Sequence, residues 1–298
     1  MSEDAVSPVV AGMLLLAIGV TFFAAWNAYF VPSMKAQSEI THLKEVESGV
    51  LRFSSDIETA ASLTSLQKKN LRLSETVPLG GGEFTFDTVK SGGSLRILGE
   101  REGYMGIIIT NGSTETRTLR FSNFSYEPVN NFWQDQGYVW SYGNVNVTKG
   151  SLTTPLQYRS MNDVTYDLTD TLFNLDAVPS SSDPSNCSVM EISVVNILPA
   201  SGHTFTSGNG NGMLVLESAA TSQQFPDISS VSVSINPEMP NGFRDALWNV
   251  VYGHANAFSG CGNVPPAFFD NGTRTVLFSP TANMTLKLKT TEITLGAY

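Results

Sequence analysis

The sequence contains few residues of the types that carry out enzyme chemistry, and their spacing does not combine them into a site. The three histidines, His42, His203 and His254, are far apart, so none forms the i, i+4 pair of a helical metal site, and no H-E-x-x-H motif occurs. The glycine-rich stretch "SGNGNGM" lacks the lysine of a phosphate-binding loop and predicts a hairpin turn, with Asn211-Gly212 as a turn before the next strand. We therefore expect a protein that is not an enzyme and holds no cofactor.

One acidic segment has the composition of a metal site. In "NDVTYDLTDTLFNLD" the oxygen ligands that calcium prefers recur at Asp163, Asp167, Asp170 and Asp176, but their order does not match the EF-hand loop. No lysine or arginine occurs between Arg159 and Arg244, and the formal net charge of the chain is -10. A solvated acidic surface therefore explains the segment better than a calcium site, and nucleic acid is not expected as a partner.

Composition favours an extracellular β-rich domain, because charged residues are few and Ser, Thr, Gly and Asn are abundant. The only two cysteines, Cys187 and Cys261, allow a single disulfide if the compartment is oxidising. Two separately buried thiols are the alternative, and the sequence leaves both readings open.

The most informative feature is the N-terminal segment from Ala5 to Met34, which contains no charged side chain. A helix that crosses a membrane needs about 20 apolar residues, and Val9 to Phe30 supplies them. A secretory signal would have a basic start and a shorter apolar run. A secretory signal is therefore the least favoured of three readings. The other two are a single-span anchor that carries a surface domain, and a helix through which copies of the chain pack together.

The apolar segment continues into an amphipathic helix, because apolar residues recur at steps of three and four at Ile40, Leu43, Val46, Val50, Phe53, Ile57 and Ala60. We expect this helix to end near Asn70 and to loosen or bend near Pro32, which has no backbone donor. The combined rod is on the order of 90 Å long at 1.5 Å per residue, too long to be enclosed in the remaining chain.

After about Leu71 the pattern changes to period two, interrupted by Gly, Asn and Pro. Strands are predicted at Ile107–Thr110, Thr116–Tyr126, Val189–Leu198, Met213–Glu217, Val231–Ile235 and Leu286–Leu288, with a hairpin turn at Gly143-Asn144. "NGFRDALWNVVYGHANAF" predicts a short helix, and Val178–Ser188 predicts a long exposed loop. The fold class is therefore α+β, a long N-terminal hydrophobic helix followed by a mainly β, sandwich-like extracellular head of one or two subdomains.

The stretch "DAVSPVVAGMLLLAIGVTFFAAW" resembles the N-terminus of archaeal type IV pilin-like proteins, of the pilin and archaellin superfamily with class III signal peptides. The resemblance implies a leader at residues 1–5, a transmembrane and filament-core helix at 6–70, and a head at 71–298. It also implies that a prepilin peptidase cuts between Ala5 and Val6, with Asp4 just before the cut. The fifth residue counted from Val6 is Val10, so the glutamate that bacterial pilins use there is missing.

The same resemblance implies a structural subunit of an extracellular filament on the cell surface, with a head for surface exposure and adhesion. Its implied partners are copies of itself, the cytoplasmic membrane before assembly, the prepilin peptidase, and the assembly ATPase and platform proteins. Small residues at Gly12, Ala17 and Gly19 would let neighbouring helices approach closely. The alternative that stays open is a single-span membrane-anchored surface domain: a receptor, adhesin, stator or minor pilin.

Six N-x-S/T sequons occur, all in the expected head, at Asn111, Asn123, Asn146, Asn186, Asn271 and Asn283. Chance would supply several of them in a chain rich in Asn, Ser and Thr. Because most lie near turns or on strands with polar flanks, and because of the archaeal resemblance, we expect at least one of them to carry a glycan.

Overall fold

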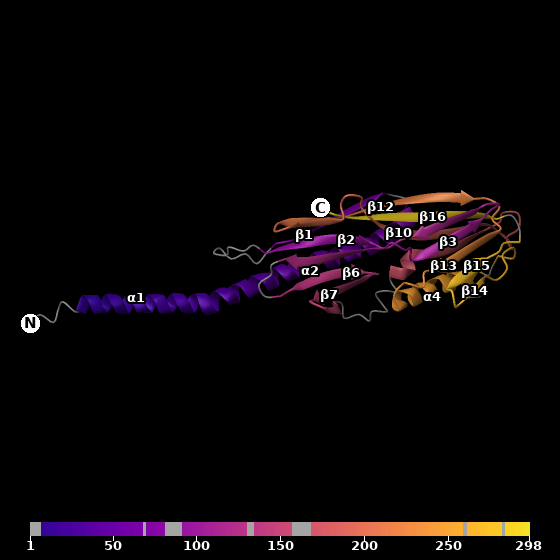
Figure 1. The fold of residues 1–298 in the computed structure, drawn as a ribbon. Helices are drawn as coiled ribbons and strands as arrows, with labels where there is room; N and C mark the ends of the chain where they lie inside the picture. The colour runs from indigo at the N-terminus through magenta and orange to yellow at the C-terminus, as the bar shows by residue number, and fades with distance from the viewer. Residues whose placement is uncertain are drawn as a thin grey trace, which may run out of the picture.

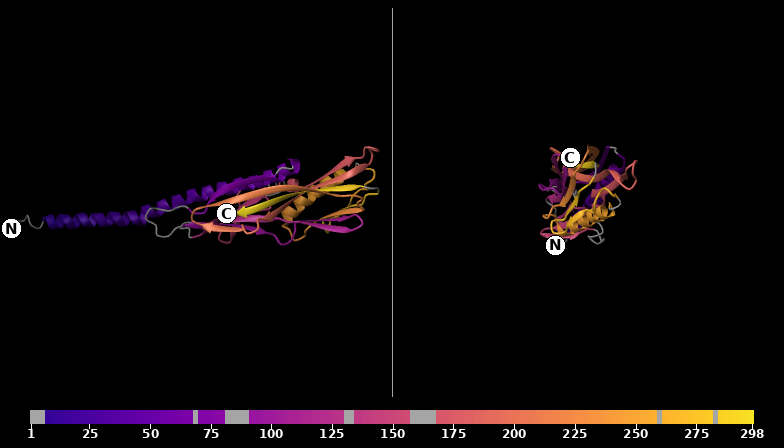
Figure 2. Two further views of the ribbon diagram at one scale, coloured as in Figure 1. Left: turned by 90° about the horizontal axis from the view of Figure 1, so that it is seen from above. Right: turned by 90° about the vertical axis from the view of Figure 1, so that its right-hand side faces the viewer.

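A computed structural model of the chain describes residues 7–67, 70–80, 91–129, 134–156, 168–258, 261–281 and 284–298. It has the predicted α+β architecture, in which one long N-terminal helix leads into a head made mostly of β-sheet (Figure 1). The first part of the helix projects from the head as a bare rod, and the second part runs along one side of the head and packs one face against it (Figure 2). The C-terminus lies at the end of the head from which the rod projects.

The long helix consists of three consecutive segments, α1 (Ser7–Ala25), the π-helical turn η2 (Trp26–Phe30) and α2 (Val31–Gln67). The predicted periodic positions from Leu43 onward face the core, each at most 4% exposed: Leu43, Val46, Val50, Phe53, Ile57 and Ala60. The loosened turn expected near Pro32 is confirmed as η2, which ends two residues before the proline.

Helix α2 packs against sheet A through β1, β12 and β16 and contacts sheet B through β6 and β7. Sheet A has the order β1 (Leu71–Pro78), β12 (Asn211–Phe225), β16 (Thr285–Ala297), β10 (Cys187–Pro199) and β9 (Phe173–Pro179). Strands β10 and β16 pair in parallel, and the other pairs in this sheet are antiparallel.

Two further antiparallel sheets complete the head. Sheet B has the order β11 (Phe205–Gly208), β2 (Gly92–Gly99), β5 (Ser122–Val129), β6 (Gln136–Ser141), β7 (Asn144–Lys149) and β8 (Leu152–Pro155). Sheet C has the order β14 (Phe268–Asp270), β15 (Thr275–Phe278), β13 (Ser230–Ile235), β3 (Met105–Thr110) and β4 (Thr114–Leu119). The predicted short helix is α4 (Asn241–Ala257), which contacts β9, β13 and β15.

The structure corrects the predicted strand at Thr116–Tyr126, which is two strands in different sheets. Strand β4 ends at Leu119 in sheet C and β5 starts at Ser122 in sheet B. Between them the backbone N–H of Arg120 donates to the Asn196 side chain at 2.7 Å, which anchors the corner to β10. A run of alternating residues does not show where the chain leaves one sheet for another.

Two predicted turns are also displaced. The β6–β7 hairpin turns at Tyr142 and Gly143, both with positive φ, and Asn144 already belongs to β7. Asn211 and Gly212 are not a turn; they pair with Pro78 and Val77 in sheet A. The absence of a side chain allows close packing there, because a Cβ on Gly212 would lie 3.0 Å from the side chains of Leu79 and Leu95, which would have to shift.

Candidate functional site

The projecting part of the long helix is the most unusual surface of the described structure. Every residue from 8 to 30 is exposed, including Leu15 and Leu16 at 71% each. The helical span Pro8–Ser62 is long and apolar enough to cross a membrane by length and composition. The 19 residues of α1 extend roughly 28 Å, close to the roughly 30 Å of a bilayer's hydrocarbon layer.

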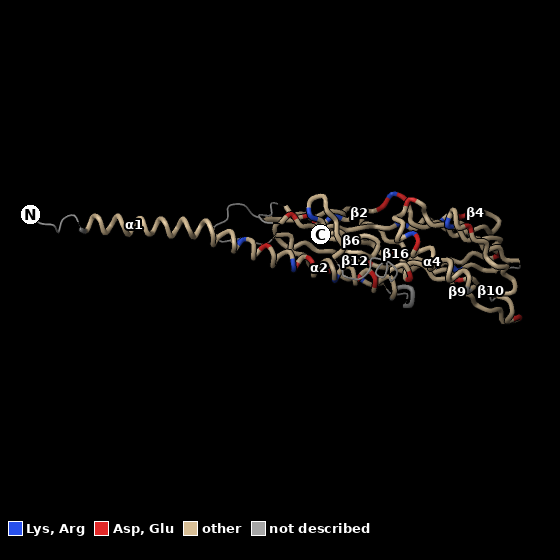
Figure 3. Tube along the Cα trace, turned by 90° about the horizontal axis from the view of Figure 1, so that it is seen from below, with Lys and Arg blue, Asp and Glu red and all other residues tan. Residues whose placement is uncertain are grey.

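Helix α1 is apolar around its whole circumference. Apart from Ser7 at its start, its one polar residue is Thr21, whose hydroxyl is satisfied within the helix because it donates to the carbonyl oxygens of Ala17 and Ile18, each at 2.9 Å. Figure 3 shows no charged residue along α1, whereas charges of both signs appear along α2. A helix that is hydrophobic on all sides is stable when lipid or other helices surround it.

The predicted packing residues lie on two faces of α1. Gly12 and Gly19 are seven residues apart and share a face, whereas Ala17 is rotated from Gly12 by roughly 140° at 3.6 residues per turn. A Cβ on Gly12 or Gly19 would meet no atom within 4 Å. Within the described part of the chain, no contact therefore requires glycine at these two positions, and both faces of α1 are exposed.

A group of polar contacts fixes the helix where it enters the head. Glu39 is 4% exposed, and its carboxylate accepts a 2.8 Å hydrogen bond from the backbone N–H of Gln134. The next inward residue, His42, is 5% exposed, with Nε2 lying 3.1 Å from the Tyr126 hydroxyl. Burial lowers the pKa of His42 below its ordinary value, although the carboxylates of Glu45 and Glu39 oppose this shift.

A second tyrosine of sheet B, Tyr138, strengthens the same junction. Its hydroxyl lies 3.2 Å from the Leu43 carbonyl oxygen and 3.2 Å from the Glu47 carboxylate, and it accepts a 2.7 Å hydrogen bond from the Gln136 amide. Burial, with the nearby Glu47 charge, raises the pKa of Tyr138, so the phenol stays a donor at physiological pH. The helix and the head are thus joined by packing and by hydrogen bonds from both strands β5 and β6.

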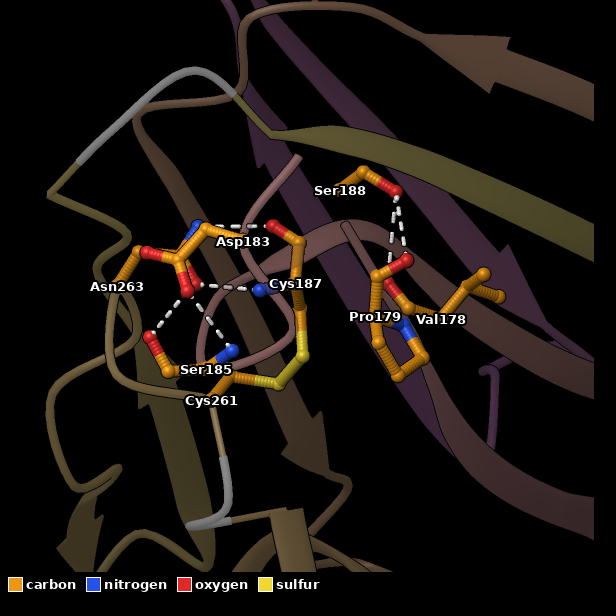
Figure 4. The surroundings of a disulfide bond; sticks show 8 residues. All are labelled: Val178, Pro179, Asp183, Ser185, Cys187, Ser188, Cys261 and Asn263. Carbon is orange, nitrogen blue, oxygen red and sulfur yellow. Dashed lines mark hydrogen bonds between the residues drawn. A yellow bond between two sulfur atoms is a disulfide. The ribbon is translucent and has the colours of Figure 1, made fainter. Parts of the chain in front are cut away.

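The far end of the head is closed by a disulfide, which resolves the open alternative for the cysteines. Cys187 and Cys261 are bonded, with Cα atoms 5.3 Å apart (Figure 4). Asn263 brackets the bridge, because its side chain accepts from the Cys187 N–H and donates to the Cys187 carbonyl oxygen, both at 2.8 Å. The adjoining loop is residues 180–186, shorter than predicted because β9 and β10 extend into it.

The sequons differ in how accessible their asparagines are. Asn271 is exposed and Asn111 half-buried in hairpin turns of sheet C, whereas Asn123 and Asn146 are half-buried on strands β5 and β7 of sheet B. Asn123 also donates to Glu100 at 3.4 Å, and Asn186 donates to Asp183 at 2.8 Å. Asn283 lies outside the described residues. Glycosylation stays a prediction, and Asn271 suits it best because it is exposed and lies in a turn.

The other two histidines pack against aromatic rings, and the described aspartates of the acidic segment lie beside ion pairs. His203 stacks on Tyr298 with ring centroids 4.2 Å apart, and His254 meets the edge of Phe173 at 6.1 Å. Within the described ranges, no three His, Cys, Asp or Glu side chains are grouped to hold a metal ion. Asp170 and Asp176 line an open cleft, in which Glu191 is paired with Lys287 at 2.8 Å and with Lys289.

Asp163 and Asp167 of the acidic segment lie outside the described residues, as do the predicted processing positions Asp4, Ala5 and Val6.

No protein-family model matches the sequence, and neither a curated protein nor a solved structure is similar enough to count as a match. The projecting helix and its junction with the head are therefore the features from which function is inferred.

Proposed function

We propose that this chain is a structural subunit of an extracellular, type IV pilus-like filament assembled through its N-terminal hydrophobic helix. Residues 1–5 are removed by a prepilin peptidase, and the mature chain starts at Val6. The subunit waits in the cytoplasmic membrane, and an ATPase and platform proteins extract it into a homopolymer. The head faces the medium and serves surface exposure and adhesion, without catalysing a reaction.

The observation that carries this proposal is the contrast between the two halves of one continuous helix. Residues 8–30 are exposed all round, while the half that follows carries core residues such as Val46 and Phe53 at 0% exposure. Moving the apolar half out of lipid is unfavourable unless other helices replace the apolar contacts, so assembly should be cooperative. The small residues on two faces of α1 suit a helix with neighbours on more than one side, as in an open polymer.

Two substitutions on the two faces test helix packing without adding charge. Ala17→Leu and Gly12→Leu keep the helix apolar and able to enter a membrane, yet they fill the space into which a neighbouring helix would pack. We expect fewer or less stable surface filaments in electron micrographs of cells, with the head still recognised by a conformational antibody. Leu16→Ile, which conserves volume, is the matched control. If Ala17→Leu and Gly12→Leu both leave the number and stability of the filaments unchanged, helix packing through these two faces of α1 is excluded.

A single-span membrane-anchored surface domain, such as a receptor, adhesin, stator or minor pilin, is the second candidate. The match between the length of α1 and the thickness of a bilayer favours it, since a permanent anchor needs nothing more. Mechanical shearing of cells separates the candidates, because it releases filaments into the supernatant and leaves anchored monomers with the membrane.

A further inference from the structure

The end of the apolar helix nearest the head carries features of a membrane–water boundary. We infer that η2 (Trp26–Phe30) lies in the lipid headgroup layer on the side of the head, and that its aromatic residues set the depth of the helix in the bilayer. The partner of this segment is thus a phospholipid surface rather than the hydrocarbon interior. The inference rests on the membrane-held subunit in the proposed function and adds the position of that subunit in the membrane.

The first observation concerns the backbone. In η2 the backbone hydrogen bonds change from the α-helical to the π-helical register. The N–H of Val31 donates to the carbonyl oxygen of Trp26, five residues earlier. Pro32 has no N–H, so it can donate neither to Asn27 in this register nor to Ala28 in the α-helical one. A backbone carbonyl that loses its helical donor is costly in hydrocarbon unless a neighbouring helix, a side chain or an ordered water replaces the bond. Such a turn is therefore more stable at a depth that water reaches.

The second observation concerns the side chains on the same turn. Trp26, Tyr29 and Phe30 are 41%, 81% and 48% exposed, and the rings of Trp26 and Phe30 pack with centroids 4.3 Å apart. Trp and Tyr are enriched at membrane–water interfaces, because their rings are apolar and their N–H or O–H groups need polar partners. Both residues occur in this one turn, after the predominantly apolar and uncharged side chains of α1.

The third observation is the agreement of lengths on both sides of η2. Below it, the roughly 28 Å of α1 matches the hydrocarbon layer. Above it, Lys35 is the first charged residue, and Glu39 is the first buried residue of the junction. Residues 31–38 between them extend roughly 12 Å, enough to pass the headgroups before the head begins. The backbone, the aromatic residues and the charge pattern thus place the boundary at the same turn.

Thiol accessibility tests this position in the full chain. Ala28→Cys, Ala17→Cys and Ser33→Cys are each reconstituted in vesicles of phosphatidylcholine and phosphatidylglycerol and treated with a membrane-impermeant maleimide. The native cysteines are joined in a disulfide, so the introduced thiol is the reactive one. We expect Ala28→Cys to react within about threefold of Ser33→Cys, and Ala17→Cys at least about tenfold more slowly, because the reagent does not enter hydrocarbon.

A second comparison tests the role of the aromatic residues. Replacing both Trp26 and Tyr29 by Leu should let the segment move deeper and slow labelling at Ala28→Cys several-fold, whereas replacing Phe22 and Phe23 by Leu should not. Slow labelling at Ala28→Cys in the unaltered background overturns the inference, because η2 would then lie in hydrocarbon. Labelling at Ala17→Cys as fast as at Ser33→Cys overturns it too, since the chain would not span the bilayer. Cells without filaments, combined with the expected labelling, reject the filament alone and leave the boundary in place.

Discussion

Nε2 of His42 lies 3.1 Å from the Tyr126 hydroxyl, which bonds the long helix to strand β5 where the helix enters the head. With the contacts of Glu39 and Tyr138, this pair gives the helix a defined position in the head before assembly. A force applied to α1 is therefore transmitted to packed strands rather than to a flexible linker. Such a joint suits a filament subunit and equally suits a domain held at a fixed height above a membrane.

The buried His42 makes the stability of the head depend on pH. Its pKa is lowered in the folded state, so the unfolded chain binds the proton first, and stability is lost as pH falls below the ordinary histidine value of about 6.5. The facing groups are Glu39, Glu45 and Tyr126. We expect the free energy of unfolding to be nearly constant above neutral pH and to decrease between about pH 6.5 and 5.

Denaturant unfolding at several pH values measures this dependence, and His42→Gln should flatten it. His203→Gln, at a residue stacked on Tyr298 at the surface of the head, is the matched control. An unchanged slope in His42→Gln would show that His42 does not carry the dependence.

Phe53 and Phe22 provide a comparison between the two halves of the helix. Phe53 is fully buried, with its ring 5.2 Å from that of Phe124, whereas Phe22 is 65% exposed. Phe53→Ala should destabilise the head by about 3–5 kcal/mol, and Phe22→Ala should leave its stability within about 0.5 kcal/mol. Chemical denaturation in detergent distinguishes these outcomes. Equal losses in both variants would mean that α1 folds against the head in solution.

The disulfide should stabilise the head independently of the helix junction at the other end. Cys187 and Cys261 are 74 residues apart, and the chain-entropy model gives about 4 kcal/mol for a loop of this length. We expect Cys187→Ser with Cys261→Ser to lower the melting temperature of the head, and a reductant to do the same to the native protein. The labelling pattern along α1 should not change. A melting temperature indifferent to reductant would show that the bridge is not formed in the isolated protein.

Much of the helix could be predicted from sequence, because a period of 3.6 residues is a local property. The strand corrections have a non-local cause: β10 pairs in parallel with β16 about a hundred residues later, and the corner at Arg120 depends on Asn196. Strand β16 also has buried residues on both faces, Leu288 on one and Ile293 on the other, so no single alternation describes it.

The exposed apolar helix of the candidate site was predicted, but its junction with the head was not. The partners of His42 and Glu39 are 84 and 95 residues away in the sequence, and no local pattern names them. The sequence does contain a sign of this junction. Glu39 and His42 fall on the same helical face as the apolar residues Leu43 and Val46, at steps of three and four residues. Polar residues on a buried face need partners, which points to a junction without identifying it.

Removal of the leader peptide distinguishes most directly between the filament subunit and the simple anchor. We expect the native mature chain to start at Val6, or within one residue of it, with the apolar helix retained. The physical reason is continuity: α1, η2 and α2 form one helix, so removing only the leader leaves the membrane segment attached to the core of the head.

Intact-mass measurement of protein from native cells decides this prediction. A mass that corresponds to a start at Val6 supports the filament subunit, whereas retention of residues 1–5 favours the simple anchor. A chain that starts after Ala28 would keep the helix–head junction at Glu39 and His42 but lose every apolar residue of α1. That result would contradict both the filament subunit and the single-span anchor. The released head would then have no segment able to span a membrane or to pack against neighbouring helices.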